Sequence, residues 1–366
     1  MIVIDDSAAP EKIQEHIRKD DQIELLGYIR RGMNGEVYFA KRKKLGDEIV
    51  LKYYLSKEGY DASEEAVILR NIDHPNILKI YDLRFVPPEY ACFVSPRIKD
   101  GDLQHHIDVD PFSSKDALRI VGQILDGVTE LHSVHKMVHR DLKPGNLLMD
   151  FKDNRVIIAD LGAVKKITEA DGFVSGSKAT RVYLPPESLV HNKYYFQSDL
   201  YQVGIIMFQL LGGFFPINNQ LEWLGKKERK EIDGIKNSIQ RELKFYELID
   251  KKIRKGSIAN TSTLPDYLGG KFKRVLNQAL HPNYKKRFQS SSEFLKAVHS
   301  LERDYPDYKK YDDHLLVSHD TGKQYKVYKD KKDKYVVEKR TEGKDWRKDK
   351  SHNGDFDSAL RLTRNN

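Results

Sequence analysis

Three polar residues near the middle of the chain have the types and the spacing that a reaction at phosphate requires. Asp141 and Asn146 lie in the string His-Arg-Asp-Leu-Lys-Pro-Gly-Asn at 139–146, and Asp160 follows one short hairpin later in Asp-Leu-Gly. Transfer of the γ-phosphoryl group of ATP needs a carboxylate for the proton of the acceptor hydroxyl and oxygen ligands for Mg²⁺. Asp141 can supply the first group, and Asn146 and Asp160 can supply the second. The pattern therefore indicates phosphoryl transfer.

The two strings resemble the catalytic loop and the metal-binding motif of the eukaryotic-type protein kinase family, and the resemblance extends over residues 21–303. It implies that Asp141 accepts or orients the hydroxyl proton, and that Asn146 and Asp160 hold Mg²⁺ or Mn²⁺. Lys143 resembles the lysine that neutralises the γ-phosphate in the serine/threonine class of the family. The resemblance thus implies an enzyme that uses ATP as co-substrate and phosphorylates serine or threonine hydroxyls of a protein partner.

A glycine-containing segment ahead of the catalytic loop is expected to hold the phosphates of the nucleotide. Residues 30–37 read Arg-Arg-Gly-Met-Asn-Gly-Glu-Val and resemble the glycine-rich loop of the family, except that Arg30 replaces its first glycine. The matching positions are Gly32, Gly35 and Val37. An ordinary glycine hairpin also fits this segment. The family spacing of 52 − 35 = 17 favours the nucleotide loop, because it brings Lys52 to the position of the lysine that binds the α- and β-phosphates.

Further side chains of the nucleotide site follow from the same resemblance. Glu65 aligns with the helix glutamate that forms an ion pair with the lysine, although a solvated helix residue would look the same. Ser95 aligns with the residue at the back of the adenine pocket, where its small side chain is expected to leave a rear pocket open. The other expected nucleotide contacts are Val50 and Leu148 on the two faces of adenine, Arg97 in the hinge between the lobes, and Asp102 near the ribose.

Residues 176–187 resemble the end of a kinase activation segment. The resemblance implies that Thr180 hydrogen-bonds the catalytic aspartate and lysine. Glu187 is expected to pair with Arg287 and to brace the second lobe. Asp199, at the start of an apolar helix, is expected to tie the backbone of the catalytic loop in place.

The same segment carries hydroxyl groups that are candidates for regulation. Arg140 precedes the catalytic aspartate, and in the family an arginine at this place can bind a phosphorylated residue of the activation segment. The candidate phosphosites are Thr168, Ser175 and Ser177. Each of them is equally compatible with a solvated loop hydroxyl. Our hypothesis is that autophosphorylation at Ser175 or Ser177 orders the segment.

Composition favours a folded chain in a reducing compartment. Of the 366 residues, 32% are charged and 39% are hydrophobic, which is typical of soluble globular proteins. The longest apolar stretch, 203–217, is interrupted by Gln209 and is too short to span a bilayer. Residues 1–6 turn acidic at once and lack the order of a secretory signal. The single cysteine, Cys92, permits no internal disulfide, so we expect a cytoplasmic location and a packing role for this side chain.

The net charge of +8 would suit an acidic partner such as nucleic acid. Acidic residues are interspersed with the lysines of the tail, however, and this favours a solvated mixed-charge surface over an acidic partner. The tail also carries aromatic residues among its lysines, namely Tyr325, Tyr328, Tyr335 and Trp346. They alternate as the core residues of strands do, which favours a packing or interaction module over a nucleic-acid site.

The resemblance implies an α+β, bilobal kinase-like fold. A strand-rich N-lobe at 21–98 precedes a helix-rich C-lobe at 99–303, and residues 1–20 form an N-terminal arm with a helix at 10–19. The expected elements of the N-lobe are a strand meander over 23–53, a helix at 62–71, and strands at 77–81 and 90–96. The C-lobe is expected to begin with a long amphipathic helix at 113–133.

A small α+β accessory module is expected after the kinase-like region. Tyr-Pro at 305–306 marks a linker over 304–314, and the module occupies 315–366. Its expected elements are strands at 324–329 and 334–339, a possible third strand at 345–350, and a helix at 356–364.

Two other interpretations fit parts of the sequence. A pseudokinase scaffold would account for Arg30 in the glycine loop and for Pro185 in place of the alanine usual in the activation segment. A kinase that acts on a small molecule is disfavoured, because the activation segment and residues 199–204 resemble the parts of the family that serve protein acceptors.

Overall fold

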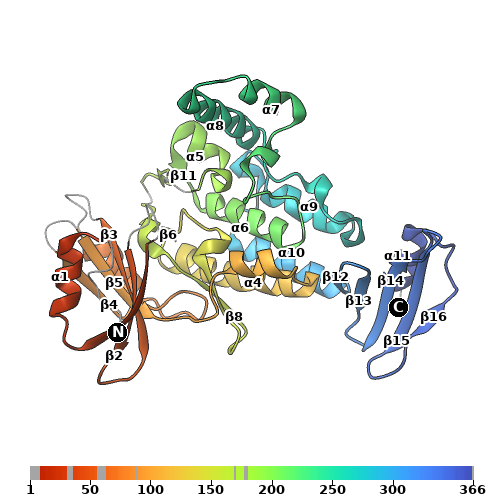
Figure 1. Cartoon of the computed structure of the whole chain (residues 1–366), viewed down its shortest axis with the longest axis horizontal. Coiled ribbons are helices and arrows are strands. Elements are labelled where there is room, and N and C mark those ends of the chain that lie inside the picture. The colour runs from red at the N-terminus through yellow and green to blue at the C-terminus, as the bar shows by residue number, and fades with distance from the viewer. Residues whose placement is uncertain are drawn as a thin grey trace.

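The computed structural model describes residues 9–30, 36–55, 63–86, 90–168, 170–176 and 180–364. These residues form a strand-rich N-lobe, a helical C-lobe, and a C-terminal sheet that lies at the far end of the C-lobe from the N-lobe (Figure 1). The expected α+β, bilobal architecture is confirmed.

The N-lobe is built on a five-stranded antiparallel sheet. In spatial order its strands are β1 (Ile23–Arg30), β2 (Glu36–Arg42), β3 (Glu48–Leu55), β5 (Tyr90–Pro96) and β4 (Asp82–Val86). The register sets Lys52 opposite Phe93 and Val50 opposite Ser95. Because side chains alternate along a strand, these four share one face, and that face borders the cleft between the lobes.

The other face of the N-lobe sheet is covered by the N-terminal helix. The helix α1 (Glu11–Lys19) buries Ile13 and Ile17 in a core that includes Tyr53 and Cys92. The Nδ1 atom of His16 lies 2.8 Å from the hydroxyl of Tyr53. The expected arm packed on the first lobe is therefore present, and Cys92 is a buried core residue. The second expected helix is α2 (Ser63–Asn71).

The expected strand at 77–81 is wrong. Ile77 forms a single bridge to Ile158, and the strand β4 begins only at Asp82. The amide of Leu78 donates to the carbonyl of Ile158 (2.9 Å), and the amide of Ile158 donates to the carbonyl of Asn76 (2.9 Å). The start of this stretch is thus tethered to the C-lobe, and only at its end does the Tyr81 amide donate to the carbonyl of Val94 in β5 (2.8 Å).

Helices dominate the C-lobe. They are α3 (Leu103–Val109), α4 (Ser114–Thr129), α5 (Pro186–His191), α6 (Phe196–Leu210), α7 (Lys226–Asp233), α8 (Ser238–Arg254), α9 (Gly270–Ala279) and α10 (Ser291–Asp304). The expected helix at 113–133 is α4 followed by a π-helical turn at Glu130–Val134. The helix α6 is apolar almost all round because α4 and α9 pack against it at the centre of the lobe.

Three two-stranded sheets place the loops of the C-lobe. They are β6 (Met137–Val138) with β9 (Lys165–Lys166), β7 (Leu147–Asp150) with β8 (Arg155–Ile158), and β10 (Val174–Ser175) with β11 (Lys193–Tyr194). Within the described ranges, no helix is both long enough and apolar enough to cross a membrane.

The C-terminal sheet has two more strands than expected. Its strands pair in chain order as β12 (Asp307–Lys310), β13 (Leu315–Ser318), β14 (Lys323–Lys329), β15 (Tyr335–Thr341) and β16 (Arg347–Asp349). The helix α11 (Phe356–Arg364) packs on one face, where Tyr325 is buried as expected of a core residue. The expected linker over 304–314 is wrong for its central part, which is strand β12.

The strand β12 is held because it also belongs to the C-lobe. Tyr308 is buried in the same apolar cluster as the C-lobe helices, and its amide donates to the Ser114 hydroxyl (2.9 Å). The Asp307 carboxylate accepts from the amide of Lys115 at the start of α4 (2.8 Å). At the other end of the module, the Arg364 guanidinium donates to the carbonyl of Tyr267 (2.7 Å). The proline at 306 therefore marks the start of a strand that docks on the kinase-like region.

Candidate active site

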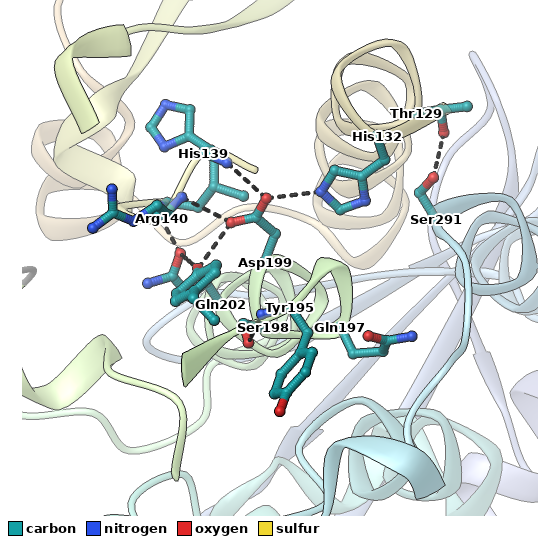
Figure 2. A network of polar contacts seen from close by, with 12 residues as sticks. Thr129, His132, His139, Arg140, Tyr195, Gln197, Ser198, Asp199, Gln202 and Ser291 are labelled. Carbon is teal, nitrogen blue, oxygen red and sulfur yellow. Dashed lines mark hydrogen bonds and ion pairs between the residues drawn. The ribbon is translucent and has the colours of Figure 1, made fainter. Parts of the chain in front are cut away.

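The catalytic loop is held by one buried carboxylate at the start of α6. Asp199 accepts from the backbone amides of His139 (2.8 Å) and Arg140 (2.9 Å), and from His132 Nε2 and the Tyr194 hydroxyl (2.8 Å each; Figure 2). Arg140 has a left-handed backbone with φ 72°, a conformation that costs about 1–3 kcal/mol in a non-glycine residue. The bond from its amide to Asp199 stabilises this conformation. The expected role of Asp199 is thereby confirmed.

Asp199 stays ionised in this setting. Burial opposes ionisation, but the hydrogen bonds that Asp199 accepts, from His132 and from the Arg140 amide, outweigh burial and lower the pKa of Asp199 below its ordinary value. A neighbouring amide completes the support, because Leu142 donates from its backbone to Gln202 Oε1 (2.9 Å). His139 is fully buried, with its Nε2 donating to the carbonyl of Ala159 (3.0 Å), so it packs beneath the loop that carries Asp160.

The loop holds Asp141 with donors at one carboxylate oxygen and no described donor at the other. Its Oδ2 atom accepts from Lys143 Nζ and Asn146 Nδ2 (2.9 Å each), and Asn146 Nδ2 also donates to the Asp141 carbonyl (2.8 Å). Its Oδ1 atom is buried and accepts no hydrogen bond. Lys143 Nζ also donates to Thr180 Oγ1 (3.1 Å), which confirms the expected contact of Thr180 with the lysine. A buried carboxylate oxygen without a donor is costly unless a ligand completes it.

Asp160 belongs to the C-lobe and contacts Lys52 and Tyr54 of the N-lobe, where the two lobes meet. Its backbone is left-handed (φ 58°), and its Oδ1 atom lies 2.6 Å from Lys52 Nζ and accepts from the Tyr54 hydroxyl (2.9 Å). Burial opposes ionisation, but the charge of Lys52 outweighs burial and lowers the pKa of Asp160 below its ordinary value. No described donor reaches Oδ2. The carboxylate is therefore charged, with one oxygen available.

A cavity of about 260 Å³ lies between the lobes, next to these groups. Its walls include the expected nucleotide contacts Val37, Val50, Lys52, Arg97, Asp102 and Leu148, together with Asn146 and Asp160. Apolar side chains from both lobes face each other across it, as two flat surfaces around an aromatic base would. The structure thus brings together the groups that the sequence predicts for the nucleotide.

Two of the expected nucleotide contacts have partners of their own. The Arg97 guanidinium bonds Glu48 (3.0 Å) and stacks on the Phe39 ring at 4.3 Å. Asp102 caps helix α3 by accepting from the His105 amide (3.0 Å). Both residues line the cavity, so their side chains shape its rim while also holding the hinge and the helix.

Some predicted residues cannot be placed. Gly32, Gly35 and Ser177 lie outside the described residues, as does the side chain of Glu65, whose backbone belongs to α2. The ion pair of Lys52 that the structure describes is the one with Asp160. The expected pairing with Glu65 stays a prediction.

Tyr54 is a site residue that the sequence interpretation missed. Its ring packs edge-on against Phe93 (5.3 Å between centroids) and lies below Lys52 Nζ at 4.8 Å. Phe93 and Tyr54 line the cavity together with Ser95, and the rear pocket expected beside this serine stays a prediction. Burial and the adjacent Asp160 raise the pKa of Tyr54 well above its ordinary value, so the hydroxyl is a donor. The two-residue spacing from Lys52 in a strand is the signal that could have revealed it.

The activation segment is tied to the C-lobe by a buried ion pair. The Arg287 guanidinium donates to both oxygens of Glu187 at 2.8 Å, and both side chains are buried, as expected. The Arg140 guanidinium donates to the carbonyls of Ala163 (3.2 Å) and Gly176 (2.7 Å). It therefore lies against the part of the segment that carries Ser175, whose side chain is exposed on β10.

The residues present fit a nucleotide-bound Mg²⁺ ion. The open oxygen of Asp160 and the amide oxygen of Asn146, which accepts no described hydrogen bond, are hard ligands of the kind this cation prefers. Lys52 and Lys143 supply positive charge on the two sides of the cleft. These two oxygens would hold the metal, and the remaining ligands would come from phosphate and water.

Comparison with known proteins agrees with this site. A sequence model described as the protein kinase domain matches residues 23–299, most of the chain. Calcium-dependent protein kinase 4 of Plasmodium berghei is 32% identical over 211 residues, which cover 55% of this chain and 39% of that protein. Calcium/calmodulin-dependent protein kinase type 1B of Homo sapiens is 32% identical over 204 residues, covering 54% and 58%.

A third relative gives the same picture. CaM kinase-like vesicle-associated protein of Xenopus laevis is 31% identical over 208 residues, covering 55% of this chain and 54% of that protein. The chain thus spans 39% to 58% of the length of these three relatives. With a matching family model over 23–299 and the cleft described above, the chain belongs to the protein kinase family.

Proposed function

We propose that this chain is a protein serine/threonine kinase, which transfers the γ-phosphoryl group of MgATP to hydroxyl groups of proteins. The observation that carries the proposal is the Oδ1 atom of Asp141, a buried acceptor with no donor, held in place by bonds to the other oxygen of the same carboxylate. An incoming hydroxyl group would supply the missing donor. Its proton would then point at a carboxylate and its oxygen at the cleft.

The other residues of the cleft act by position and charge. Lys52 and Lys143 each carry a cation into the cleft, where they would offset the negative charge of the phosphates. Asn146 and Asp160 would hold Mg²⁺, which when bound neutralises charge on the phosphate oxygens. The fold therefore has to align Asp141, Asn146 and Asp160. The Asp199 network fixes the loop that carries the first two of these residues.

The acceptor class rests on Lys143. Its ammonium group bridges Asp141 and Thr180, so the catalytic loop and the end of the activation segment are joined at the place where an acceptor hydroxyl would enter. A serine or threonine side chain is short enough to reach Asp141 from an extended peptide. A cytoplasmic location stays a prediction, as does a packing or interaction role of the C-terminal module in preference to nucleic-acid binding.

Autophosphorylation of the activation segment is part of the proposal. Ser175 is exposed, and Arg140 donates to the carbonyl of the next residue, Gly176. A phosphate on Ser175 or Ser177 would lie near this guanidinium. Arg140 would then donate to the charged phosphate in place of the Gly176 carbonyl. Mass spectrometry of the protein after incubation with MgATP should find phosphate between Asp160 and Glu187. A fully unmodified segment from active enzyme would contradict this part.

Transfer of radiolabelled phosphate to a panel of protein acceptors tests the main proposal. Replacement Lys52→Met should lower the transfer rate by about 100-fold or more, because the cation next to Asp160 is lost. Replacement Lys348→Met, on the exposed strand β16, is the matched control and should leave the rate within about twofold. Wild-type protein that folds and binds MgATP without transferring phosphate would favour the pseudokinase interpretation instead.

A further inference from the structure

The hydroxyl of Tyr54 and the ammonium of Lys52 meet at one oxygen of Asp160. Lys52 Nζ lies 2.6 Å from Oδ1, and the Tyr54 hydroxyl donates to the same atom at 2.9 Å. No described donor reaches the second oxygen, Oδ2. A carboxylate that is held by two donors at one oxygen has little freedom to rotate, and its other oxygen keeps a fixed direction.

Packing gives Tyr54 little freedom of its own. Its ring contacts Phe93 edge-on, at 5.3 Å between centroids, and lies below the Lys52 ammonium at 4.8 Å. Gly162 closes the other side so tightly that a Cβ atom there would lie 2.6 Å from Cε1 of the ring. The Tyr54 hydroxyl is thereby aimed at Asp160 from a ring that strand β3 and the loop after Asp160 clamp between them.

We propose that Tyr54 is a positioning residue for Asp160: its hydroxyl holds Oδ1 so that Oδ2 faces the metal that accompanies ATP. This inference rests on the proposed function. Lys52 alone cannot fix the carboxylate in the same way, because an ammonium on a flexible stem is a point charge with rotatable donors. The phenol adds a second, directional bond from a rigid ring. In this role Tyr54 acts through Asp160, to which its hydroxyl donates.

The inference predicts a specific loss in the coupling between metal and nucleotide. We define the coupling as the ratio of ATP affinity in excess Mg²⁺ to ATP affinity in EDTA. Replacement Tyr54→Phe keeps the ring and removes one hydrogen bond to a charged group, so the coupling should fall about tenfold. Affinity in EDTA should stay within about twofold, because the walls of the cavity are unchanged.

The neighbouring tyrosine of the same strand is a matched control. The Tyr53 side chain points to the opposite face of β3, where its hydroxyl lies 2.8 Å from His16 Nδ1. Replacement Tyr53→Phe makes the same chemical change as Tyr54→Phe, because it removes one tyrosine hydroxyl from the same strand. Its coupling should match that of the wild type. A difference between the two variants therefore isolates the contact with Asp160 from general loosening of the N-lobe.

Calorimetric titration of the full chain with ATP, in Mg²⁺ and in EDTA, gives the coupling for wild type and both variants. An unchanged coupling in Tyr54→Phe overturns the inference. Equal loss of affinity in Mg²⁺ and in EDTA also overturns it, because that result means a packing role. Wild-type protein that binds no ATP in either buffer overturns the proposed function and the inference with it, and the wild-type titration alone identifies that case.

Discussion

The carboxylates of the catalytic cleft and those of the α6 scaffold differ in how many of their oxygens already have donors. Asp199 accepts four hydrogen bonds, two at each oxygen. Glu187 accepts from Arg287 at both oxygens. In contrast, Asp141 and Asp160 each keep one oxygen that no described donor reaches. A carboxylate accepts about four hydrogen bonds. The two scaffold carboxylates, Asp199 and Glu187, have donors at both oxygens and are called filled below. The two cleft carboxylates have described donors at one oxygen only and are called half-filled.

This difference separates structural aspartates from reactive ones where burial does not. Asp199 and Asp141 are both buried. Asp199 accepts from a backbone amide of the catalytic loop, and Asp141 belongs to that loop. The filled carboxylate fixes the loop, and the half-filled one is left with affinity for a ligand. The comparison therefore predicts that the first should matter mainly for stability and the second mainly for rate.

The largest expected effect is on rate, at the half-filled carboxylate of the loop. Replacement Asp141→Asn keeps the size of the side chain and removes the base, so the rate of phosphate transfer should fall by about 10²–10⁴-fold. The free energy of unfolding should change by less than about 1 kcal/mol, because Oδ1 has no donor to lose. Initial rates and urea unfolding measure the two quantities. A large loss of stability in this variant would break the comparison.

At Asp199 a smaller effect is expected, mainly on the free energy of unfolding and less on the rate. Replacement Asp199→Asn sets an amide against four donors, and the free energy of unfolding should fall by about 3 kcal/mol. Urea unfolding at neutral pH measures this change. Activity should fall as well, since the left-handed Arg140 backbone loses its partner. A variant that unfolds like the wild type and only loses rate would show that Asp199 acts in the reaction and not in the scaffold.

The parts of the site that were predictable from the sequence lie within short strings. Asp141, Lys143 and Asn146 are separated by only a few residues, so their mutual contacts follow from one loop conformation. The pairing of Glu187 with Arg287 spans 100 residues and was available only through the resemblance to a family. Contacts across such distances depend on how whole helices pack, which periodicity does not reveal.

The contacts that the sequence interpretation missed join separate elements. Tyr54 meets Asp160 across the cleft, 106 residues along the chain. Its two-residue spacing from Lys52 indicates a shared face of the strand, but it does not indicate which residue of the other lobe the hydroxyl contacts. The stretch 77–81 has the alternation of a strand, but its start forms a single bridge to Ile158 of the C-lobe. A tyrosine-proline pair resembled a linker, yet Tyr308 just after it is buried against the C-lobe.

The smallest expected effect concerns a third kind of carboxylate, in the C-terminal sheet. Asp349 is buried and accepts from the Ser351 amide (2.9 Å), and its Oδ2 lies 2.8 Å from Lys339 Nζ. The Lys339 bond, acting against burial, lowers the pKa of Asp349 to about 2. This carboxylate is filled like those of the scaffold, but its cation is half exposed to water. Its contribution should therefore be weaker than that of Asp199.

The sign of the effect follows from the lowered pKa. The folded state holds the Asp349 carboxylate ionised to lower pH than the unfolded state does, so the stabilisation is present above about pH 4 and is lost as the pH falls toward 2. Between pH 7 and pH 3, wild type should lose about 1 kcal/mol more stability than Asp349→Asn in urea unfolding. The control Asp333→Asn removes an exposed partner of Lys329 in the same sheet and should lose as much as wild type. Equal losses of stability in wild type and Asp349→Asn would mean that solvent completely screens the pair of Asp349 and Lys339. A carboxylate with donors at both oxygens would then stabilise the fold only where the protein also excludes water from those donors.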